Sequence, residues 1–257
     1  MNFNSKPAEK VGIADLNRRA LSRMSKEREN CCMSQTRRRT FLKRTVIVVA
    51  YAIAMAYLES AVVVYLQHAL SMTPATLFPL REQGTLGGLG TIEVGREVAT
   101  IVMLATLGWL AGRTSLERLA WTSVAFGIWD IGYYFWLWVY IGWPTSLGTT
   151  DLLFLLPVPW VAPVAAPIIV SLALIGFGLV AAIRLNRGEQ VILEVKEWLT
   201  LLVGGLIVIL SFTLNARHIL NGGMPRSFSW PIFLIGMAVA GHGARSILLP
   251  KPKASVL

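Results

Sequence analysis

Six long runs of apolar residues, separated by short polar stretches, fill the chain from residue 45 onward. Each run has about the 20 mostly apolar residues that a helix needs to cross the hydrocarbon core of a bilayer. The pattern therefore predicts an all-α fold, a polytopic integral membrane bundle of six transmembrane helices. The expected spans are residues 45–67, 94–112, 119–141, 161–185, 198–214 and 230–249.

Two stretches between the expected spans depart from a plain bundle. Residues 67–93 form a long connection with glycines at 84, 87, 88 and 90, which favours a flexible external loop. Residues 151–163 are apolar but contain three prolines, and proline breaks a helix interior. Non-helical backbone at membrane depth has to pack on protein or line a cavity. We therefore expect a Pro-rich interfacial or re-entrant segment before the fourth span.

The first 44 residues differ in composition from the rest of the chain. They hold twelve Lys or Arg residues and four acids, whereas the whole 257-residue chain is 54% hydrophobic and only 15% charged. A soluble domain has roughly 25% charged residues, so a soluble globular protein is excluded. The expected organisation is a basic, disordered cytoplasmic arm over 1–44, a transmembrane domain over 45–250 and a short cytoplasmic tail over 251–257.

Lysine and arginine lie mostly on one side of the expected bundle. They are dense in the arm and follow the second, fourth and sixth spans, whereas the loop over 142–150 has none. By the positive-inside rule, we expect both termini in the cytoplasm of a bacterial-type inner membrane. Because the basic residues concentrate in the arm, nucleic acid is not an expected partner. The expected partners are membrane lipids and other proteins of a membrane complex.

The arm carries one motif with a second interpretation. The sequence Arg-Arg-Arg-Thr-Phe-Leu-Lys over 37–43 matches the pattern of twin-arginine export signals, except that arginine stands at 37 where Ser or Thr is usual. A cleavable signal has an apolar region of about 7 to 15 residues, but the apolar run here continues to Leu66. We favour a basic anchor for the first span, with twin-arginine routing as the alternative.

Several polar side chains fall within or beside the expected spans. A carboxylate near the bilayer centre costs about 2.5 to 3.5 kcal/mol on the insertion scale, so each is treated first as a functional candidate. The candidates for a ligand or proton pathway are Glu59, Arg96, Glu97, Asp130, Tyr133 and Tyr134. The secondary candidates, at the expected outer boundary, are His68, Glu93 and Asp151.

Two interpretations of these residues stay open. In the first, Arg96 neutralises Glu59 or Glu97, and the set fixes the register of the helices. Tyr133 then hydrogen-bonds Asp130, which lies three residues earlier on the same helix face. In the second interpretation, the residues line an outward-opening polar pocket between the first three spans that holds a substrate, an ion or a cofactor.

The sequence identifies no cofactor. The Glu-x-x-His pairs of di-iron bundles are missing, and no H-E-x-x-H or G-x-S-x-G motif occurs. Cys31 and Cys32 have no further ligands near them in the sequence, and haem ligation by His68 and His218 is an alternative. Three functions stay open: a small-molecule or proton-coupled transporter or transporter subunit, a membrane-embedded enzyme acting on a lipid or isoprenoid, and an anchoring or assembly subunit. Whether the protein is an enzyme therefore stays open.

Overall fold

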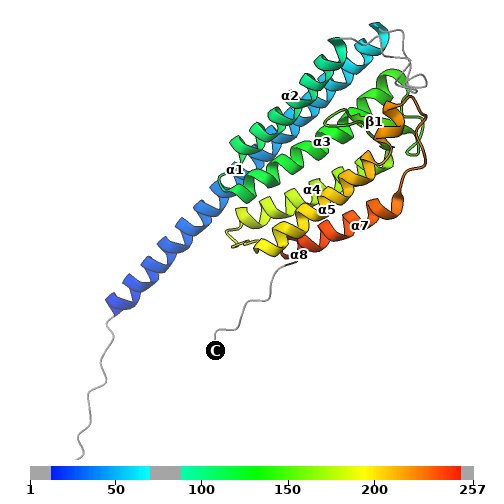
Figure 1. The fold of residues 1–257 in the computed structure, drawn as a ribbon. Helices are drawn as coiled ribbons and strands as arrows, with labels where there is room; N and C mark the ends of the chain where they lie inside the picture. The colour runs from blue at the N-terminus through cyan, green and yellow to red at the C-terminus, as the bar shows by residue number, and fades with distance from the viewer. Residues whose placement is uncertain (1–12, 70–87, 250–257) are drawn as a thin grey trace, which may run out of the picture. The chain divides into compact units, whose positions relative to one another are not determined.

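A computed structural model describes residues 13–69 and 88–249 and is mostly helical (Figure 1). The chain divides into two units, Met1–Arg44 and Thr45–Leu257. The elements are α1 (Ile13–Ala69), α2 (Gly88–Ala111), α3 (Ser115–Ile141), β1 (Thr150–Phe154), β2 (Trp160–Pro163), α4 (Ala165–Asn186), α5 (Val195–Thr213), α6 (Ala216–Leu220), α7 (Trp230–Gly243) and α8 (Arg245–Leu248).

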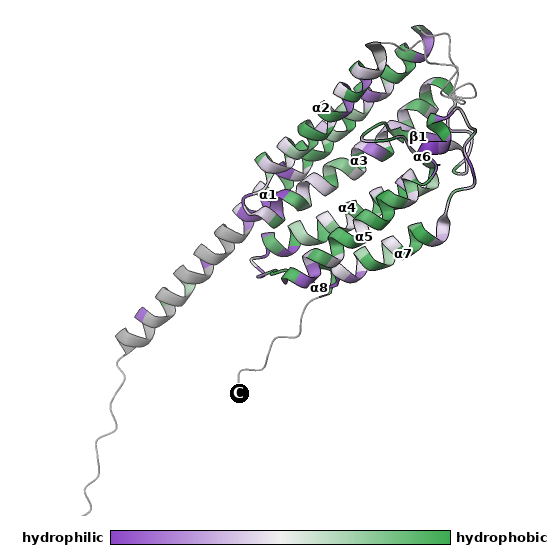
Figure 2. Ribbon diagram, in the orientation of Figure 1, coloured by the Kyte–Doolittle hydropathy of each residue, from purple (hydrophilic) through white to green (hydrophobic). Residues whose placement is uncertain are grey.

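Five helical segments are long and apolar enough to cross a membrane, as expected for an integral membrane protein. They are Gln35–Ala69, Gly90–Ala111, Ser115–Ile141, Ala165–Asn186 and Val195–Leu220. Apolar residues run along these helices, and hydrophilic residues gather mainly at their ends (Figure 2). This distribution is what a bilayer requires, because the helix keeps its backbone hydrogen bonds within itself while its side chains face lipid.

The sixth expected span is a shorter helix, so the count of six is not confirmed. α7 has 14 residues, which rise about 21 Å at 1.5 Å per residue, less than the roughly 30 Å of hydrocarbon. The helix ends at Gly243, and α8 follows after Ala244. Glycine is a poor helix former, and a Cβ at 243 would lie 2.7 Å from the backbone nitrogen of Leu201. A close approach to α5 therefore accompanies the break.

The N-terminal unit differs from the expected disordered arm, because residues 13–44 are helical as the first part of α1. The physical reason lies in composition and continuity. Arg, Lys, Ala, Leu, Met and Glu are good helix formers, and extending an existing helix avoids the unfavourable nucleation step. Net positive charge prevents a packed core in this segment but does not prevent a helix.

Two boundaries predicted from the sequence are corrected. The helix α2 begins at Gly88 rather than at 94, so Gly88, Gly90 and Glu93 are helical and do not belong to the expected loop over 67–93. Of that loop, residues 70–87 lie outside the described residues. The fourth helix begins at Ala165 rather than at 161, because residues 160–163 form a strand.

The Pro-rich segment before α4 is a β-hairpin. β1 and β2 pair antiparallel, with Thr150 opposite Pro163 and Leu152 opposite Val161, and the register shifts between Leu152 and Phe154. The hairpin supplies the non-helical backbone that the prolines predict, and the strands satisfy one another's backbone groups. Its location at the interface or within the bilayer stays a prediction.

Glycines allow two pairs of helices in the C-terminal unit to pack closely. On α4, a Cβ at Gly178 would collide with the carbonyl oxygen of Ala120 on α3. On α5, a Cβ at Gly204 would collide with the backbone of Ala240 on α7. Small residues at such crossings let helix backbones approach, which is the main source of packing energy inside lipid. The two pairs α3–α4 and α5–α7 are thus each tightly associated.

Candidate functional site

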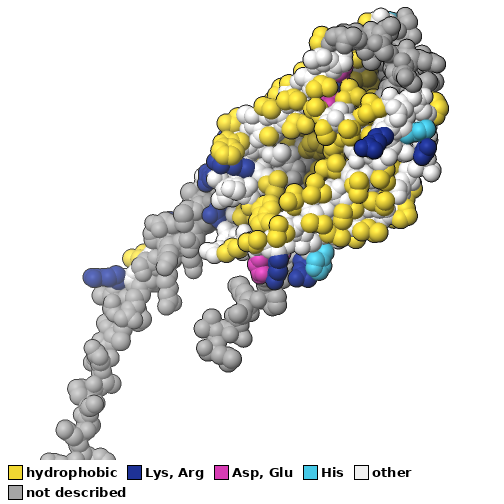
Figure 3. All heavy atoms as spheres, in the orientation of Figure 1, with side chains coloured by type: hydrophobic (Ala, Val, Ile, Leu, Met, Phe, Trp, Pro, Cys, Tyr) yellow, Lys and Arg dark blue, Asp and Glu magenta, His cyan; other side chains and the backbone are white. Residues whose placement is uncertain are grey.

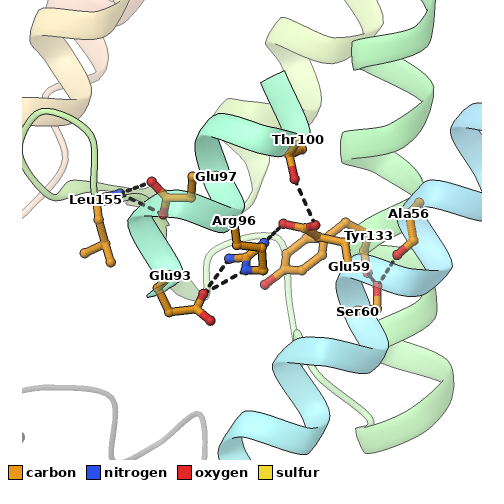
Figure 4. A network of polar contacts seen from close by, with 9 residues as sticks. All are labelled: Ala56, Glu59, Ser60, Glu93, Arg96, Glu97, Thr100, Tyr133 and Leu155. Carbon is orange, nitrogen blue, oxygen red and sulfur yellow. Dashed lines mark hydrogen bonds and ion pairs between the residues drawn. The ribbon is translucent and has the colours of Figure 1, made fainter. Parts of the chain in front are cut away.

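An ion-pair network joins α1 and α2 (Figure 4). Arg96 on α2 forms an ion pair with Glu59 of α1, and its Nε donates a hydrogen bond to Glu93 Oε2 at 2.8 Å. Thr100 Oγ1 donates to Glu59 Oε2 at 3.2 Å. All these side chains are at least half-buried. The guanidinium therefore neutralises carboxylates from two helices and fixes their register, as the first interpretation expects for Glu59, with Glu93 as the second partner.

Glu97, one residue after Arg96, turns toward the hairpin instead (Figure 4). Both of its carboxylate oxygens accept from the backbone N–H of Leu155, each at 3.0 Å. The side chain is buried, and a backbone N–H bonded to a carboxylate is a strong, charge-assisted hydrogen bond. Glu97 thus holds the turn between β1 and β2 against α2, a role that the sequence does not predict.

Tyr133 lies beside this ion-pair network, but no hydrogen bond among the described residues links it to Glu59, Arg96 or Glu93. Its ring is next to Glu59 and Arg96 (Figure 4), and its carbonyl oxygen accepts from Ser60 Oγ at 3.0 Å. Ser60 also donates to the carbonyl of Ala56. The expected hydrogen bond from Tyr133 to Asp130 is not among these contacts. Tyr133 instead belongs to the packing of α1 against α3.

Asp130 and Asp151 each have a partner that the sequence analysis missed. Asp130 Oδ2 accepts from Ser171 Oγ on α4 at 2.8 Å. Asp151 Oδ2 accepts from the hydroxyl of Tyr134 at 2.9 Å, and its Oδ1 accepts from the N–H of Leu152 at 2.8 Å. One signal could have found Ser171, because it is the only hydroxyl-bearing residue in the apolar run over 165–182.

The contacts of the candidate residues divide them into smaller groups, and one pocket between the first three spans stays a prediction. His68 stands one residue before the end of α1, and nine residues of helix place it about 13 Å along the axis from Glu59. Within the described residues, no group of three or more His, Cys, Asp or Glu side chains could hold a metal ion. The polar set divides into an ion network, a hairpin anchor and two buried aspartates.

The larger of two described cavities lies elsewhere, between the pair α3–α4 and the pair α5–α7, with the hairpin at one end. Its volume is about 770 Å³. Of its lining side chains, only Ser123, Asp130 and Ser171 carry a hydroxyl or a carboxyl. Other lining residues are Phe126 of α3, Phe154 and Trp160 of the hairpin, Phe177 of α4, Leu202 and Gly205 of α5, and Met237 and Gly241 of α7.

The cavity has the size and composition of a small-molecule binding site. Small-molecule sites enclose roughly 300 to 1,000 Å³, are mostly apolar and carry a few placed polar groups. Asp130 is the one carboxyl group on this wall, and Ser171 holds it from the facing helix. A carboxyl group can accept hydrogen bonds from a hydroxyl or an amine of a ligand.

Comparison of the chain with protein-family models, curated proteins and solved structures gives no match.

Asp151 lies in β1, outside the membrane-capable helices, and its pKa is perturbed. Burial raises the pKa from 3.8 to about 6, although the hydrogen bonds from Tyr134 and Leu152 oppose the shift. A folded-state pKa above the unfolded value means that folding favours the protonated carboxyl. The contribution of Asp151 to stability is therefore fully present below about pH 4 and is lost as the pH rises through about 6.

We expect the variant Asp151→Asn to gain stability relative to the wild type as the pH rises from 4 to 7. The quantity of interest is the difference in the free energy of unfolding between Asp151→Asn and the wild type. At 1.36 kcal/mol per pKa unit, we expect this difference to change by about 3 kcal/mol between pH 4 and pH 7. Thermal unfolding in detergent at four pH values between these limits measures it. Glu189→Gln, at a partly exposed carboxyl that pairs with Arg184 after α4, is the control for removal of a carboxyl outside the hairpin. A difference between Asp151→Asn and wild type that stays constant with pH contradicts the assignment.

Proposed function

We propose that the protein is an integral membrane protein that binds a lipid-like amphiphile in the cavity between α3–α4 and α5–α7. The observation that carries this proposal is the composition of the cavity wall, which is mostly apolar and carries a hydroxyl or carboxyl only at Asp130, Ser171 and Ser123. An apolar wall favours the hydrocarbon part of a ligand through burial. The carboxyl group of Asp130 gives one fixed position for a hydroxyl or amine group on that ligand.

The exposure of the cavity's edges supports access from the bilayer. Leu202 of α5 lines the cavity and is 59% exposed, and the lining residues Gly176 and Gly241 are also exposed. These residues lie on helix faces that are apolar and, in a membrane, meet lipid chains. A lipid or isoprenoid can therefore enter sideways, without leaving the hydrocarbon.

The cavity favours a lipid or isoprenoid ligand over the water-soluble solute or proton of the transporter hypothesis. A solute pathway needs polar groups that face open space, and the carboxylates of the α1–α2 network face Arg96 instead. The same ligand class is compatible with a membrane-embedded enzyme acting on a lipid. Binding of the amphiphile is the part of that function which the geometry supports.

Ligand retention tests the proposal through Asp130. Native mass spectrometry and lipid extraction of protein purified in mild detergent are expected to detect a bound amphiphile in the wild type. Asp130→Asn removes the charge but keeps the shape, and we expect it to lower occupancy at least tenfold while the unfolding temperature changes little. The control is Ser211→Ala, a buried hydroxyl on α5 that bonds the Val208 carbonyl and does not line the cavity. Equal occupancy in Asp130→Asn and wild type contradicts the proposal.

We further propose that the loop over 142–150 lies outside and the turn over 187–194 lies inside a bacterial-type inner membrane, with both termini cytoplasmic. The support is the distribution of lysine and arginine. In a background lacking Cys31 and Cys32, a cysteine introduced at Ser146 is expected to react with an impermeant thiol reagent on intact cells. One introduced at Asn186 is expected to stay unlabelled. The reverse labelling pattern inverts the orientation.

A further inference from the structure

A second, smaller recess lies beside the hairpin, and its lining is more polar than the lining of the large cavity. Its volume is about 360 Å³. One side is formed by the hairpin and the loop before it, and the other by the segment that leads into α7. The lining residues that could bind a ligand through side chains are Thr150, Arg226, Ser227 and Trp230.

Arg226 contacts two residues of the preceding segment. Its Nη2 lies 3.5 Å from Nδ1 of His218, and its carbonyl oxygen accepts from Asn215 Nδ2 at 3.4 Å. The imidazole of His218 in turn lies over the backbone of Gly223, where a Cβ would collide with the ring. The His218 ring, which the Arg226 guanidinium contacts, is therefore positioned by packing.

No carboxylate among the described residues lies within ion-pair distance of Arg226. Arg96 and Arg184, by contrast, each have a glutamate partner. Figure 3 shows Lys and Arg side chains at both ends of the helical body, with hydrophobic side chains between them. A positioned guanidinium beside hydroxyl groups and without a counter-ion matches the geometry that binds a phosphate or carboxylate through paired hydrogen bonds.

We infer that this recess binds an anionic oxygen group, a phosphate or a carboxylate, with Arg226 as the main ligand and with Ser227 and Thr150 as hydroxyl donors. His218 is a positioning residue, because it acts on the anion through Arg226. The group can belong to a free anion or to the headgroup of an anionic lipid. The site is separate from the apolar cavity, and β2 contributes Trp160 to the cavity and Val161 to the recess.

Two binding measurements distinguish the sources of the anion. Inorganic phosphate is titrated into the full-length protein in a non-ionic detergent by calorimetry. In parallel, exchange of anionic phospholipid is followed in nanodiscs of zwitterionic lipid doped with phosphatidylglycerol. Phosphate binding in detergent indicates a free-anion site, and enrichment of the anionic lipid alone indicates a headgroup site. Either result supports the inference if it depends on Arg226.

Matched variants test that dependence. We expect Arg226→Gln to weaken anion binding at least tenfold, whereas Arg187→Gln, an exposed arginine after α4 away from the recess, leaves it unchanged. Gly223→Ala keeps every charge but displaces the His218 ring, and we expect a threefold or larger loss. Unfolding temperatures of all variants verify that each is folded. No anion binding in the wild type, or equal losses in Arg226→Gln and Arg187→Gln, overturns the inference.

Discussion

Replacement of Gly204 by leucine is expected to destroy most of the folded protein. At this position α5 and α7 are in backbone contact, and a Cβ would lie 2.7 Å from Cα and 2.8 Å from Cβ of Ala240. These atoms belong to the backbone and to the first side-chain carbon, so no rotamer change can make room, and the helices have to separate. Overpacking costs about 1 to 3 kcal/mol and occasionally more, and separation also loses the contacts along the crossing. The yield of monodisperse protein and the unfolding temperature measure the effect.

The neighbouring glycine gives the matched control. A Cβ at Gly205 meets nothing within 4 Å, and this residue lines the large cavity. We therefore expect Gly205→Leu to fold with a nearly unchanged unfolding temperature but to lose bound amphiphile, because the leucine side chain occupies part of the cavity. Similar stability of the two leucine variants contradicts the described crossing of α5 and α7. Full ligand retention in Gly205→Leu contradicts the proposed binding cavity.

Replacement of Arg96 by methionine is the second change with a large expected effect. It removes the cation with which Glu59 and Glu93 form ion pairs. The two glutamate side chains are only 12% and 16% exposed. Breaking a buried ion pair by removing one partner costs about 3 to 5 kcal/mol. We expect a fall of this size in the free energy of unfolding, measured by reversible denaturation in mixed micelles.

Two further variants assign that loss to the uncompensated carboxylates. Adding Glu59→Gln to Arg96→Met removes one of them and is expected to recover at least a third of the lost stability, which a double-mutant cycle quantifies. Arg118→Met is the matched surface change, since the Arg118 guanidinium lies over the ring of Trp109 at 3.6 Å. Such contacts contribute about 0.5 to 1 kcal/mol at exposed sites. If Arg118→Met costs as much as Arg96→Met, the network has no special role.

Hydrophobic patterning predicted the helices well and their ends less well. The run over 119–141 lies within α3, because about 20 apolar residues in succession have few alternatives to a membrane helix. The start of α2 was placed six residues too late, at 94, because glycines at 88 and 90 indicate a loop when they are taken alone. In the structure Gly88, Gly90 and Glu93 all lie within α2, so local composition is a poor guide to the boundary.

The sequence predicted which polar residues matter better than it predicted their partners. The pairing of Arg96 with Glu59 is one of its expectations, but the sequence does not choose between Glu59 and Glu97 as the partner of Arg96. The choice depends on how α2 is rotated relative to α1 and the hairpin. Ser171 could not be linked to Asp130 for the same reason, because 41 residues separate them and the contact follows from the crossing of α3 and α4.

The hairpin has a consequence for the order in which the protein assembles. Its turn is bound by Glu97 of α2, and Asp151 at its start accepts from Tyr134 of α3. Both partners precede the hairpin in the chain, so they leave the ribosome first, and the hairpin can be fixed as soon as it is synthesised. The helices α5 and α7 follow later. The end wall of the cavity is thus available as a template before the helices that close its side arrive, and the C-terminal pair completes the cavity last.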